Sequence, residues 1–349
     1  MLSLMRTSDF DYALPKELIA QTPISPRDAS RMLVCNRGDQ VRKHRIFREL
    51  PDFLRPRDVL VINETRVIPA RLLGIKVETA VPVEFLLLKR LQTDVWEALV
   101  KPGRRLRQGT LVSFGEGLLQ ARVEETLAQG TRTVRFTYKG LFENILETLG
   151  ETPLPPYIHE KLSDRGRYQT VYAKQDGSAA APTAGLHFTQ EVLDRIRSMG
   201  IDIVPVLLHV GLGTFRPVKA EDLSDHTMHS EYYEVTKDAA DRINAARLGG
   251  GRIVCVGTTS VRTLETVADS RGIIHPGSGE TSIFIMPGVA FKACDVLLTN
   301  FHLPQSTLLM LVSAFMGREN ALSAYGEAVR EKYRFFSFGD CMLIGEALV

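Results

Sequence analysis

The sequence predicts a mixed α/β fold in which a larger α/β domain carries an inserted, small antiparallel β-barrel domain. Apolar strand-like runs alternate with helical patterns in residues 1–67 and again in residues 150–349. Between these segments, residues 68–149 contain short β-type runs separated by turn residues at intervals of about 8–12 residues, which is typical of an antiparallel barrel. Because an insertion is tolerated where two surface points lie close together, we expect one discontinuous α/β domain, 1–67 and 150–349, and one inserted domain, 68–149.

The composition fits a globular protein with a sizeable core. Of the 349 residues, 44% are hydrophobic and 24% are charged. Lys and Arg number 43 against 41 Asp and Glu, so the net charge is +2 and no global basic field indicates a nucleic-acid partner. The four Cys are isolated, which disfavours a disulfide framework or a structural zinc site and fits a reducing cytoplasm. No apolar run approaches a membrane span, and the charged N-terminal residues do not fit a signal peptide.

The first α/β segment begins with a short helix, predicted over 15–20 because a proline suits the first turn of a helix. The run 31–35 is predicted to form a strand that ends at the turn residues 36–38. The run 59–63 is apolar nearly throughout and is therefore predicted to be a strand that is buried on both faces.

Six β-type runs are predicted in the inserted domain, with almost no helix among them. The runs cover 70–77, 83–88, 95–100, 110–114, 118–124 and 131–138. A helix over 141–149 and an extended proline-rich linker over 152–158 then lead back to the α/β domain.

The second α/β segment is predicted to alternate strands and helices. The expected strands are 201–210, 252–257, 296–299 and 340–344, and the expected helices are 189–199, 237–248, 260–268, 306–316 and 319–333. Thr189 suits the N-cap of the first of these helices, and Gly200 suits its C-terminal end.

Three predicted strands end in polar residues, in the segments 209–217, 257–265 and 299–307. Because open α/β sheets bind ligands at the carboxyl ends of their strands, we expect these segments to converge on one pocket. Each segment also has a plain structural interpretation, as a tight turn, a capped helix start or an ordinary connection. The two glycines after His209 do not continue into a dinucleotide-binding fingerprint, because Arg216 occupies the place of the third glycine.

Two further segments carry histidines. His187 follows a stretch of small residues and lies just before a helix N-terminus, which favours anionic groups; the alternative is a flexible loop with a capping histidine. In a strand over 226–235, His229, Glu231 and Tyr233 would point to one face, where an imidazole and a carboxylate could perform acid–base chemistry. The alternative is a solvated strand edge, and a metal site is less well supported because the H-E-x-x-H pattern is absent.

Basic residues gather in two places. Residues 27–57 contain nine Lys and Arg against four acids, and residues 101–107 contain four basic residues at a predicted turn of the inserted domain. A basic hairpin tip on a small barrel can contact phosphates, so both segments are candidates for RNA binding. The alternative is a solvated charged surface.

Eleven short motifs follow one another along the chain. They lie in residues 9–15, 63–71, 101–103, 153–158, 167–172, 182–188, 209–215, 228–231, 257–265, 299–304 and 333–340. Each is weak alone, but in this order they are specific, and the chain resembles the S-adenosylmethionine:tRNA ribosyltransferase-isomerase family of queuosine biosynthesis over essentially its whole length. The departures are small: residues 1–4 look like an extra leader, and the three alanines 179–181 look like a local variant.

The resemblance implies a particular reaction and the same architecture of an α/β domain with an inserted barrel. The family uses S-adenosylmethionine as a ribosyl donor and moves the isomerised ribosyl part onto 7-aminomethyl-7-deazaguanine in tRNA. That base occupies the wobble position of tRNAs with G-U-N anticodons. The product is epoxyqueuosine, and adenine and methionine are released. The resemblance also implies a monomer without a metal, and we expect it in the cytoplasm.

The resemblance also suggests which residues act. Catalytic roles are expected for His187, His209, His229 and Glu231. We expect Glu231 or His229 to be the base that removes a proton next to the sulfonium, and His187 or His209 to be the acid that assists adenine departure. The residues expected to hold S-adenosylmethionine are Gly211, Gly213, Thr214, Phe215, Thr258, Thr259, Ser260, Arg262, Asn300 and His302. Among them, Arg262 would meet the methionine carboxylate. The residues expected to contact tRNA are Arg42, Lys43, Arg45, Arg66, Arg71, Lys101, Arg104, Arg105 and Arg107.

Two other functions are also compatible with parts of the sequence. An S-adenosylmethionine-dependent RNA methyltransferase would need a glycine-rich first strand-to-helix turn, which the sequence lacks. A non-catalytic tRNA-binding protein would need only the basic segments, but that function would not explain the polar residues at the strand ends.

Overall fold

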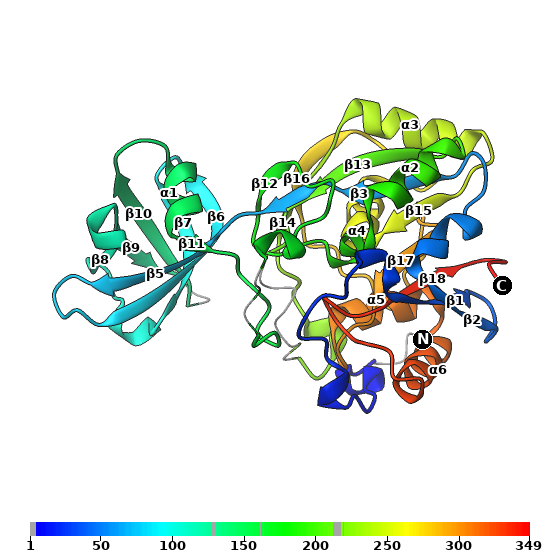
Figure 1. The fold of residues 1–349 in the computed structure, drawn as a ribbon, viewed down its shortest axis with the longest axis horizontal. Helices are drawn as coiled ribbons and strands as arrows, with labels where there is room; N and C mark the ends of the chain where they lie inside the picture. The colour runs from blue at the N-terminus through cyan, green and yellow to red at the C-terminus, as the bar shows by residue number, and fades with distance from the viewer. Residues whose placement is uncertain (1–4, 128–129, 161, 163, 212–217, 219) are drawn as a thin grey trace. The chain divides into compact units, whose positions relative to one another are not determined.

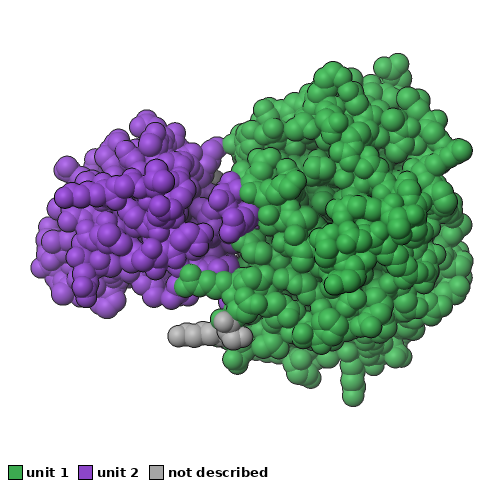
Figure 2. Space-filling model, turned by 45° about the horizontal axis from the view of Figure 1, so that its top comes forward, with its two compact units in different colours: residues 1–65, 156–175, 181–349 green, residues 66–155, 176–180 purple. Residues whose placement is uncertain are grey.

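The computed structural model describes residues 5–127, 130–160, 162, 164–211, 218 and 220–349. The chain forms two compact units (Figure 2). We call them the α/β unit, Met1–Thr65, Pro156–Gln175 and Ala181–Val349, and the barrel unit, Arg66–Pro155 and Asp176–Ala180. The α/β fold with an inserted barrel is as predicted. The predicted bounds of the inserted domain, 68–149, differ slightly from those of the barrel unit, and they stay a prediction.

A mixed sheet of nine strands forms the centre of the α/β unit (Figure 1). The strands are β1 (Arg31–Asn36), β2 (Arg42–Ile46), β3 (Val59–Asn63), β13 (Asp202–Leu208), β14 (Glu231–Val235), β15 (Ile253–Val256), β16 (Gly277–Thr281), β17 (Val296–Asn300) and β18 (Cys341–Gly345). Their order is β16-β14-β13-β3-β15-β17-β18-β1-β2. Strands β13, β3, β15 and β17 are parallel, whereas β18 is antiparallel to β17 and parallel to β1.

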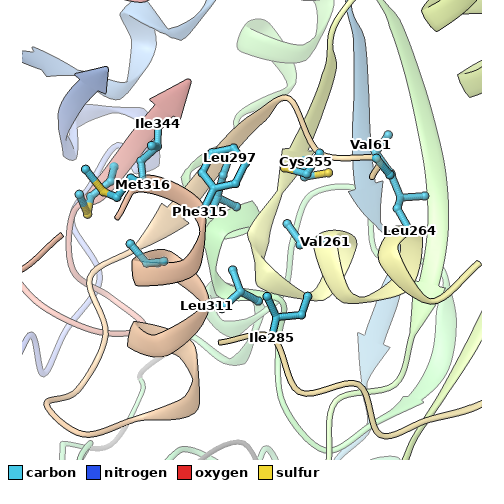
Figure 3. Close-up of a cluster of buried hydrophobic side chains, with 14 of the residues drawn as sticks. Val61, Cys255, Val261, Leu264, Ile285, Leu297, Leu311, Phe315, Met316 and Ile344 are labelled. Atoms are coloured by element: carbon cyan, nitrogen blue, oxygen red, sulfur yellow. The ribbon is translucent and has the colours of Figure 1, made fainter. Parts of the chain in front are cut away.

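Helices cover both faces of this sheet (Figure 1). They are α2 (Gln190–Ser198), α3 (Lys237–Leu248), α4 (Gly257–Val267), α5 (Thr307–Met316) and α6 (Arg318–Arg330). Val59 and Val61 of β3 pack in one core with α3, α4, α5 and α6, whereas Leu60 and Ile62 pack in a second core with α2. Successive strand residues point to opposite faces, so a strand between two helical layers needs an unbroken apolar run. Figure 3 shows part of the first core, where α4 and α5 meet the sheet.

The predicted helix ends agree with local hydrogen bonds. Thr189 caps α2, because its side-chain oxygen accepts a hydrogen bond of 3.3 Å from the backbone N of Val192. Gly200, directly after the C-cap of α2, has φ +76°, the left-handed conformation that favours glycine at a helix end. Ser306 caps α5 in the same way as Thr189 caps α2.

Some predicted elements need correction. The helix expected over 15–20 is only a short 3-10 turn, η2 (Lys16–Leu18). Helix α4 begins at Gly257 and not at residue 260, because Gly257 adopts φ +84° and lets β15 pass directly into the helix. Strands β2 and β16 were not predicted at all; both are polar and lie at the two edges of the sheet, so neither shows an apolar run.

The barrel unit confirms the predicted antiparallel barrel. Its elements are β5 (Arg71–Lys76), β6 (Pro82–Gln92), β7 (Val95–Lys101), β8 (Leu111–Phe114), β9 (Leu119–Thr126), β10 (Arg132–Tyr138), α1 (Phe142–Leu149) and β11 (Gly150–Glu151). The strand order is β11-β5-β6-β7-β10-β9-β8, and a further pairing of β5 with β8 closes six strands into a barrel. Phe85, Trp96, Phe114 and Phe142 belong to its buried core. A small sheet joins β4 (Thr65–Val67) to β12 (Gln175–Ser178).

Within the part of the chain that the structure describes, no helix has the length and apolar character needed to cross a membrane.

Candidate functional site

One edge of the large sheet collects the ends of several strands. The carboxyl ends of β3, β13, β15 and β17 share this edge because these strands are parallel. Strands β18 and β1 run in the opposite direction, so their first residues reach the same edge. Asn300, at the end of β17, pairs with Cys341 at the start of β18, and Cys341 pairs with Met32 near the start of β1. Residues that are far apart in the sequence therefore meet here.

A hollow of about 690 Å³, part of which is open to solvent, lies at this edge. All three predicted segments contribute to its lining, although 209–217 contributes only the apolar Val210 and its residues 212–217 lie outside the described residues. The predicted site residues that line it are Thr258, Thr259, Asn300 and His302, and the other lining residues include Tyr157, Pro182, Thr183, Val210, Phe336 and Ser337.

His187 does not line this hollow but is bonded to a residue that does. The ring is only 4% exposed. Its Nδ1 lies 2.7 Å from Ser30 Oγ, and its Nε2 accepts a hydrogen bond of 3.3 Å from Asn300 Nδ2. Burial is the largest cause that lowers the pKa of His187 to about 3, and the nearby guanidinium groups of Arg27 and Arg334 contribute to this shift. The imidazole is therefore neutral at pH 7, and its two nitrogens are used as hydrogen-bonding groups.

Asn300 and His302 continue this uncharged network. Asn300 Nδ2 also donates to the carbonyl of Phe336 at 3.0 Å, while its Oδ1 is buried and has no partner among the described residues. His302 Nε2 lies 2.8 Å from Thr299 Oγ1, and its backbone N donates to the hydroxyl of Tyr325 at 3.1 Å. Burial lowers the pKa of His302 to about 3 as well. We call His187, Asn300 and His302 the neutral side of the site.

Glu231 and Arg262 form a buried ion pair, with side chains only 3% and 4% exposed. Glu231 Oε2 pairs with Arg262 Nη1, and Glu231 Oε1 accepts a hydrogen bond of 2.9 Å from the backbone N of Gly211. Nε and Nη2 of Arg262 are buried without a partner in the described chain. Both oxygens of the Glu231 carboxylate therefore have hydrogen-bond donors. We call this pair the ion-pair side of the site.

His209 lies directly after β13, at the carboxyl end of that strand. Its Nδ1 lies 2.8 Å from Thr65 Oγ1, and its ring stacks on Tyr232 with a centroid distance of 5.8 Å. The backbone N of His209 donates to the carbonyl of Tyr232 at 2.9 Å. These contacts orient a half-buried imidazole at the sheet edge, where the strand ends meet.

The expected arrangement around His229 is wrong. Strand β14 begins at Glu231, so His229 lies before the strand, and strand alternation does not place it on the face of Glu231 and Tyr233. The alternative of a solvated strand edge is wrong too, because β14 lies between β13 and β16. His229 is half-buried in a segment without regular structure, close enough to His226 to lower the pKa of that residue, although burial of His226 is the larger cause.

Thr259 and Ser260, both expected to hold S-adenosylmethionine, lie near the start of α4, but only Thr259 lines the hollow. Ser260 is fully buried inside α4, and its hydroxyl donates to the carbonyl of Val256 at 2.8 Å. Thr259 Oγ1 is buried without a partner among the residues described. Three of the expected residues, Gly213, Thr214 and Phe215, lie outside the described residues.

The basic residues expected to contact tRNA fall into two groups. Four form ion pairs with acids of the chain: Arg42 with Glu327, Arg45 with Glu49, Arg66 with Asp176, and Arg71 with Glu84 and Glu151. The other five are exposed: Lys43, Lys101, Arg104, Arg105 and Arg107. Exposed cations are the better candidates for phosphate contact, because an ion pair must be broken before a paired arginine can bind another anion.

Several residues of the site were not predicted. Tyr157 stacks on Phe336 at a centroid distance of 4.7 Å, and its hydroxyl lies 2.7 Å from Ser337 Oγ. All three residues line the hollow, and Ser30 holds His187. Tyr157, Phe336 and Ser337 do lie in motifs of the resemblance, but no polar strand end marks them, and Ser30 carries no sequence signal of its own.

No group of three or more His, Cys, Asp or Glu that could hold a metal ion occurs in the described ranges.

Comparison with known proteins shows the family of the chain. Residues 7–344 match the family described as queuosine biosynthesis protein. Proteins named S-adenosylmethionine:tRNA ribosyltransferase-isomerase are 62% identical in Symbiobacterium thermophilum, over 97% of this chain and 100% of that protein, and 61% identical in Moorella thermoacetica, with the same coverage. The crystal structure of S-adenosylmethionine tRNA ribosyltransferase from Thermotoga maritima is 40% identical, with a TM-score of 0.56 over 97% of this chain and 100% of that one. The chain therefore belongs to the queuosine biosynthesis protein family.

Proposed function

We propose that this protein is an S-adenosylmethionine:tRNA ribosyltransferase-isomerase. It transfers and isomerises the ribosyl part of S-adenosylmethionine onto 7-aminomethyl-7-deazaguanine at the tRNA wobble position. The products are epoxyqueuosine in tRNA, adenine and methionine. The full-length likeness to enzymes of that name supports the proposal.

The observation that carries the proposal is the hollow where the ends of three strands meet. Its lining combines a stacked aromatic pair, Tyr157 and Phe336, with two buried oxygens that lack partners in the described chain, Asn300 Oδ1 and Thr259 Oγ1. An unpartnered buried polar atom is costly, so a ligand that supplies a donor stabilises it. Apolar faces with a few converging polar groups fit a purine nucleoside, the part of S-adenosylmethionine that includes the ribosyl group.

The environments of the acidic and basic groups narrow their proposed roles. A ring whose pKa is about 3, such as that of His187, holds no proton at pH 7, so it suits positioning of Asn300 better than protonation of adenine. His209 is then the proposed acid. Glu231 is held by Arg262 and Gly211, which leaves His229 as the proposed base, because no ion pair engages it in the described chain.

The α/β unit is proposed to be the catalytic domain, and the exposed basic turn of the barrel unit is proposed to contact tRNA phosphates. The tip residues Lys101, Arg104, Arg105 and Arg107 are all exposed. The substrate would be a tRNA with a G-U-N anticodon, and the enzyme a cytoplasmic monomer without a metal. Arg262 Nε and Nη2 would receive the methionine carboxylate, since both are buried donors without a partner among the described residues.

The test incubates the purified protein with S-adenosylmethionine and a G-U-N tRNA that carries 7-aminomethyl-7-deazaguanine. We expect a nucleoside mass gain that matches the epoxycyclopentanediol group, together with free adenine and methionine. The His209→Gln variant should turn over about 100-fold more slowly, the usual contribution of a general acid. His275→Gln, at a 59% exposed histidine beside Asp269, is the matched control and should keep full activity.

Other outcomes would contradict the proposal in distinct ways. A methyl-sized gain with S-adenosylhomocysteine would identify a methyltransferase. Tight tRNA binding without any reaction would identify a tRNA-binding protein. Full activity of His209→Gln would leave the function standing and remove His209 as the acid.

A further inference from the structure

Five arginines lie together beside the candidate site, on segments that are far apart in the sequence. Hydrogen bonds to backbone carbonyls join these segments: Arg27 Nη2 donates to Gly166 at 2.8 Å, and Arg31 Nη1 donates to Glu331 at 2.7 Å. Arg167 donates to Ile24, and Arg334 donates to Thr22. With the exposed Arg165, these residues form what we call the arginine surface: Arg27, Arg31, Arg165, Arg167 and Arg334.

The arginine surface carries positive charge that few acids offset. None of the five arginines forms an ion pair with a carboxylate in the part of the chain that the structure describes. Two nearby acids offset part of the charge: Asp164 lies close enough to act on Arg27, and Asp340 lies close enough to act on Arg31 and Arg334. Both carboxylates are also held by backbone N–H groups, Asp164 by that of Gly166 and Asp340 by those of Arg31 and Arg334. This contrasts with Arg42, whose guanidinium is neutralised by Glu327.

Some guanidinium donors of this surface remain available. Arg167 Nε is buried and has no partner among the described residues. Arg27 uses Nη1 and Nη2 on carbonyl oxygens, with no hydrogen bond from Nε in the described chain. A guanidinium has five N–H groups, so both arginines keep donors for an oxyanion.

The surface adjoins the site through a single layer of side chains. Arg27 and Arg167 line a second hollow, of about 260 Å³ including open space, together with His187 and Ser337. Ser337 also lines the larger hollow, and His187 is bonded to Asn300, which lines it as well. The topology gives the reason, because the segments before β1 and β18 reach the same sheet edge as the end of β17.

The chemistry of this surface fits a phosphodiester of a large ligand. Arginine binds phosphate through its planar fork of N–H groups, and it does so more specifically than a point charge. A small free anion would need only the inner pair, Arg27 and Arg167. The surface instead extends outward to Arg165, which is exposed, and to Arg31 and Arg334, which suits a chain of phosphates.

We propose that the arginine surface binds backbone phosphates of the tRNA next to the nucleotide that is modified. This inference rests on the proposed function, since it takes tRNA as the substrate. It places a phosphate contact on the α/β unit, beside the site itself, in addition to the basic turn proposed for the barrel unit.

The test measures binding of an unmodified G-U-N tRNA transcript to the full-length protein across about 50–200 mM salt. Arg165→Gln is the first variant, because Arg165 makes no hydrogen bond or ion pair within the described residues and its loss should leave the fold intact. Arg167→Gln is the second. Each should weaken binding about 3- to 10-fold and reduce the slope of log affinity against log salt by about 0.7–0.9.

The matched control is Arg242→Gln, which also removes one positive charge from the α/β unit. Arg242 forms an ion pair with Asp202, the first residue of β13. This pair therefore lies at the opposite end of the strand from the candidate site. The Arg242→Gln variant should leave both the affinity for tRNA and the slope against log salt unchanged.

Two results would overturn the inference. An unchanged salt slope in Arg165→Gln and Arg167→Gln would show that tRNA does not contact this surface. A raised KM for S-adenosylmethionine with normal tRNA binding would assign Arg167 to the methionine carboxylate instead. Because the binding assay needs no turnover, a wild-type protein that binds tRNA with the expected slope but forms no epoxyqueuosine would contradict the proposed function and leave the arginine surface in place.

Discussion

The two sides of the candidate site are buried to a similar degree but handle charge in opposite ways. On the neutral side, His187 and His302 are 4% and 8% exposed, and burial keeps both rings uncharged by lowering each pKa to about 3. On the ion-pair side, Glu231 and Arg262 are equally buried, yet each faces the opposite charge. The comparison teaches that burial alone does not set the charge of a group; the presence of a partner within reach does.

The difference also determines how each side can respond to a ligand. The neutral side offers hydrogen-bonding groups, including Asn300 Oδ1, which has no partner within the described part of the chain, and its geometry does not depend on a balanced charge. The ion-pair side holds a fixed charge pair, with two guanidinium donors of Arg262 that have no partner among the described residues. We therefore expect the neutral side to tolerate single substitutions and the ion-pair side not to.

The largest effect is expected from breaking the ion pair at one end. Arg262→Met removes the guanidinium that pairs with the buried Glu231 carboxylate, which should reduce the free energy of unfolding by about 3–5 kcal/mol. Urea denaturation at neutral pH measures this loss.

The control removes both charges. Glu231→Leu combined with Arg262→Met removes both charges of the pair, and it should recover most of the lost stability. If the single and double variants were equally unstable, packing of the Arg262 side chain would be responsible and the proposed contrast between the two sides would fail.

An intermediate effect is expected on the neutral side, and it depends on pH. The folded-state pKa of His187, about 3, lies below its value of about 6.5 in an unfolded chain. Between these values the unfolded state binds a proton that the folded state does not, so acidification favours unfolding. Stability that is fully present above about pH 6.5 is lost as the pH falls toward 3, at about 1.4 kcal/mol per pH unit.

The measurement compares wild type with His187→Gln at about pH 7.5 and about pH 5. The wild type should lose about 2 kcal/mol more than the variant over this interval, because the variant lacks the titrating ring. His302→Gln should behave in the same way, since the pKa of His302 is also about 3. Equal losses in wild type and in both variants would mean that the pKa of each ring is the same in the folded protein as in the unfolded chain. The rings would then be charged at about pH 5, and the description of the neutral side would be wrong.

The parts of the site that the sequence predicts are those that follow from periodicity and topology. Apolar runs such as 59–63 mark buried strands, and the polar ends of parallel strands must share an edge, so Thr258 and Asn300 could be assigned to one pocket. Strand β16 could not be found in this way, because the residues Gly277–Thr281 contain two glycines and no apolar alternation. It is held at the edge of the sheet by pairing with β14.

The parts that the sequence does not predict depend on contacts between distant residues. Arg42 is basic and lies in a basic segment, but its charge is neutralised by Glu327, 285 positions further along the chain. In the same way, nothing near residue 187 in the sequence indicates that Ser30 and Asn300 hold the ring of His187. Charge pairing and burial arise only when the sheet brings separate segments together, and these two factors determine which candidates are available for catalysis or RNA binding.

The smallest effect is expected from removing one hydrogen bond on the neutral side. Thr299→Val keeps the shape of the side chain but leaves His302 Nε2 without the hydroxyl that lies 2.8 Å away. The loss should be about 1 kcal/mol in unfolding free energy, well below that of Arg262→Met, because no charge is left unpaired. Since His302 lines the hollow and the Tyr325 hydroxyl still holds its backbone N, the ring can reorient, and the KM for S-adenosylmethionine should rise several-fold while kcat changes little. A loss as large as that of Arg262→Met would mean that a single hydrogen bond on the neutral side is as critical as the ion pair, and the contrast between the two sides would not hold.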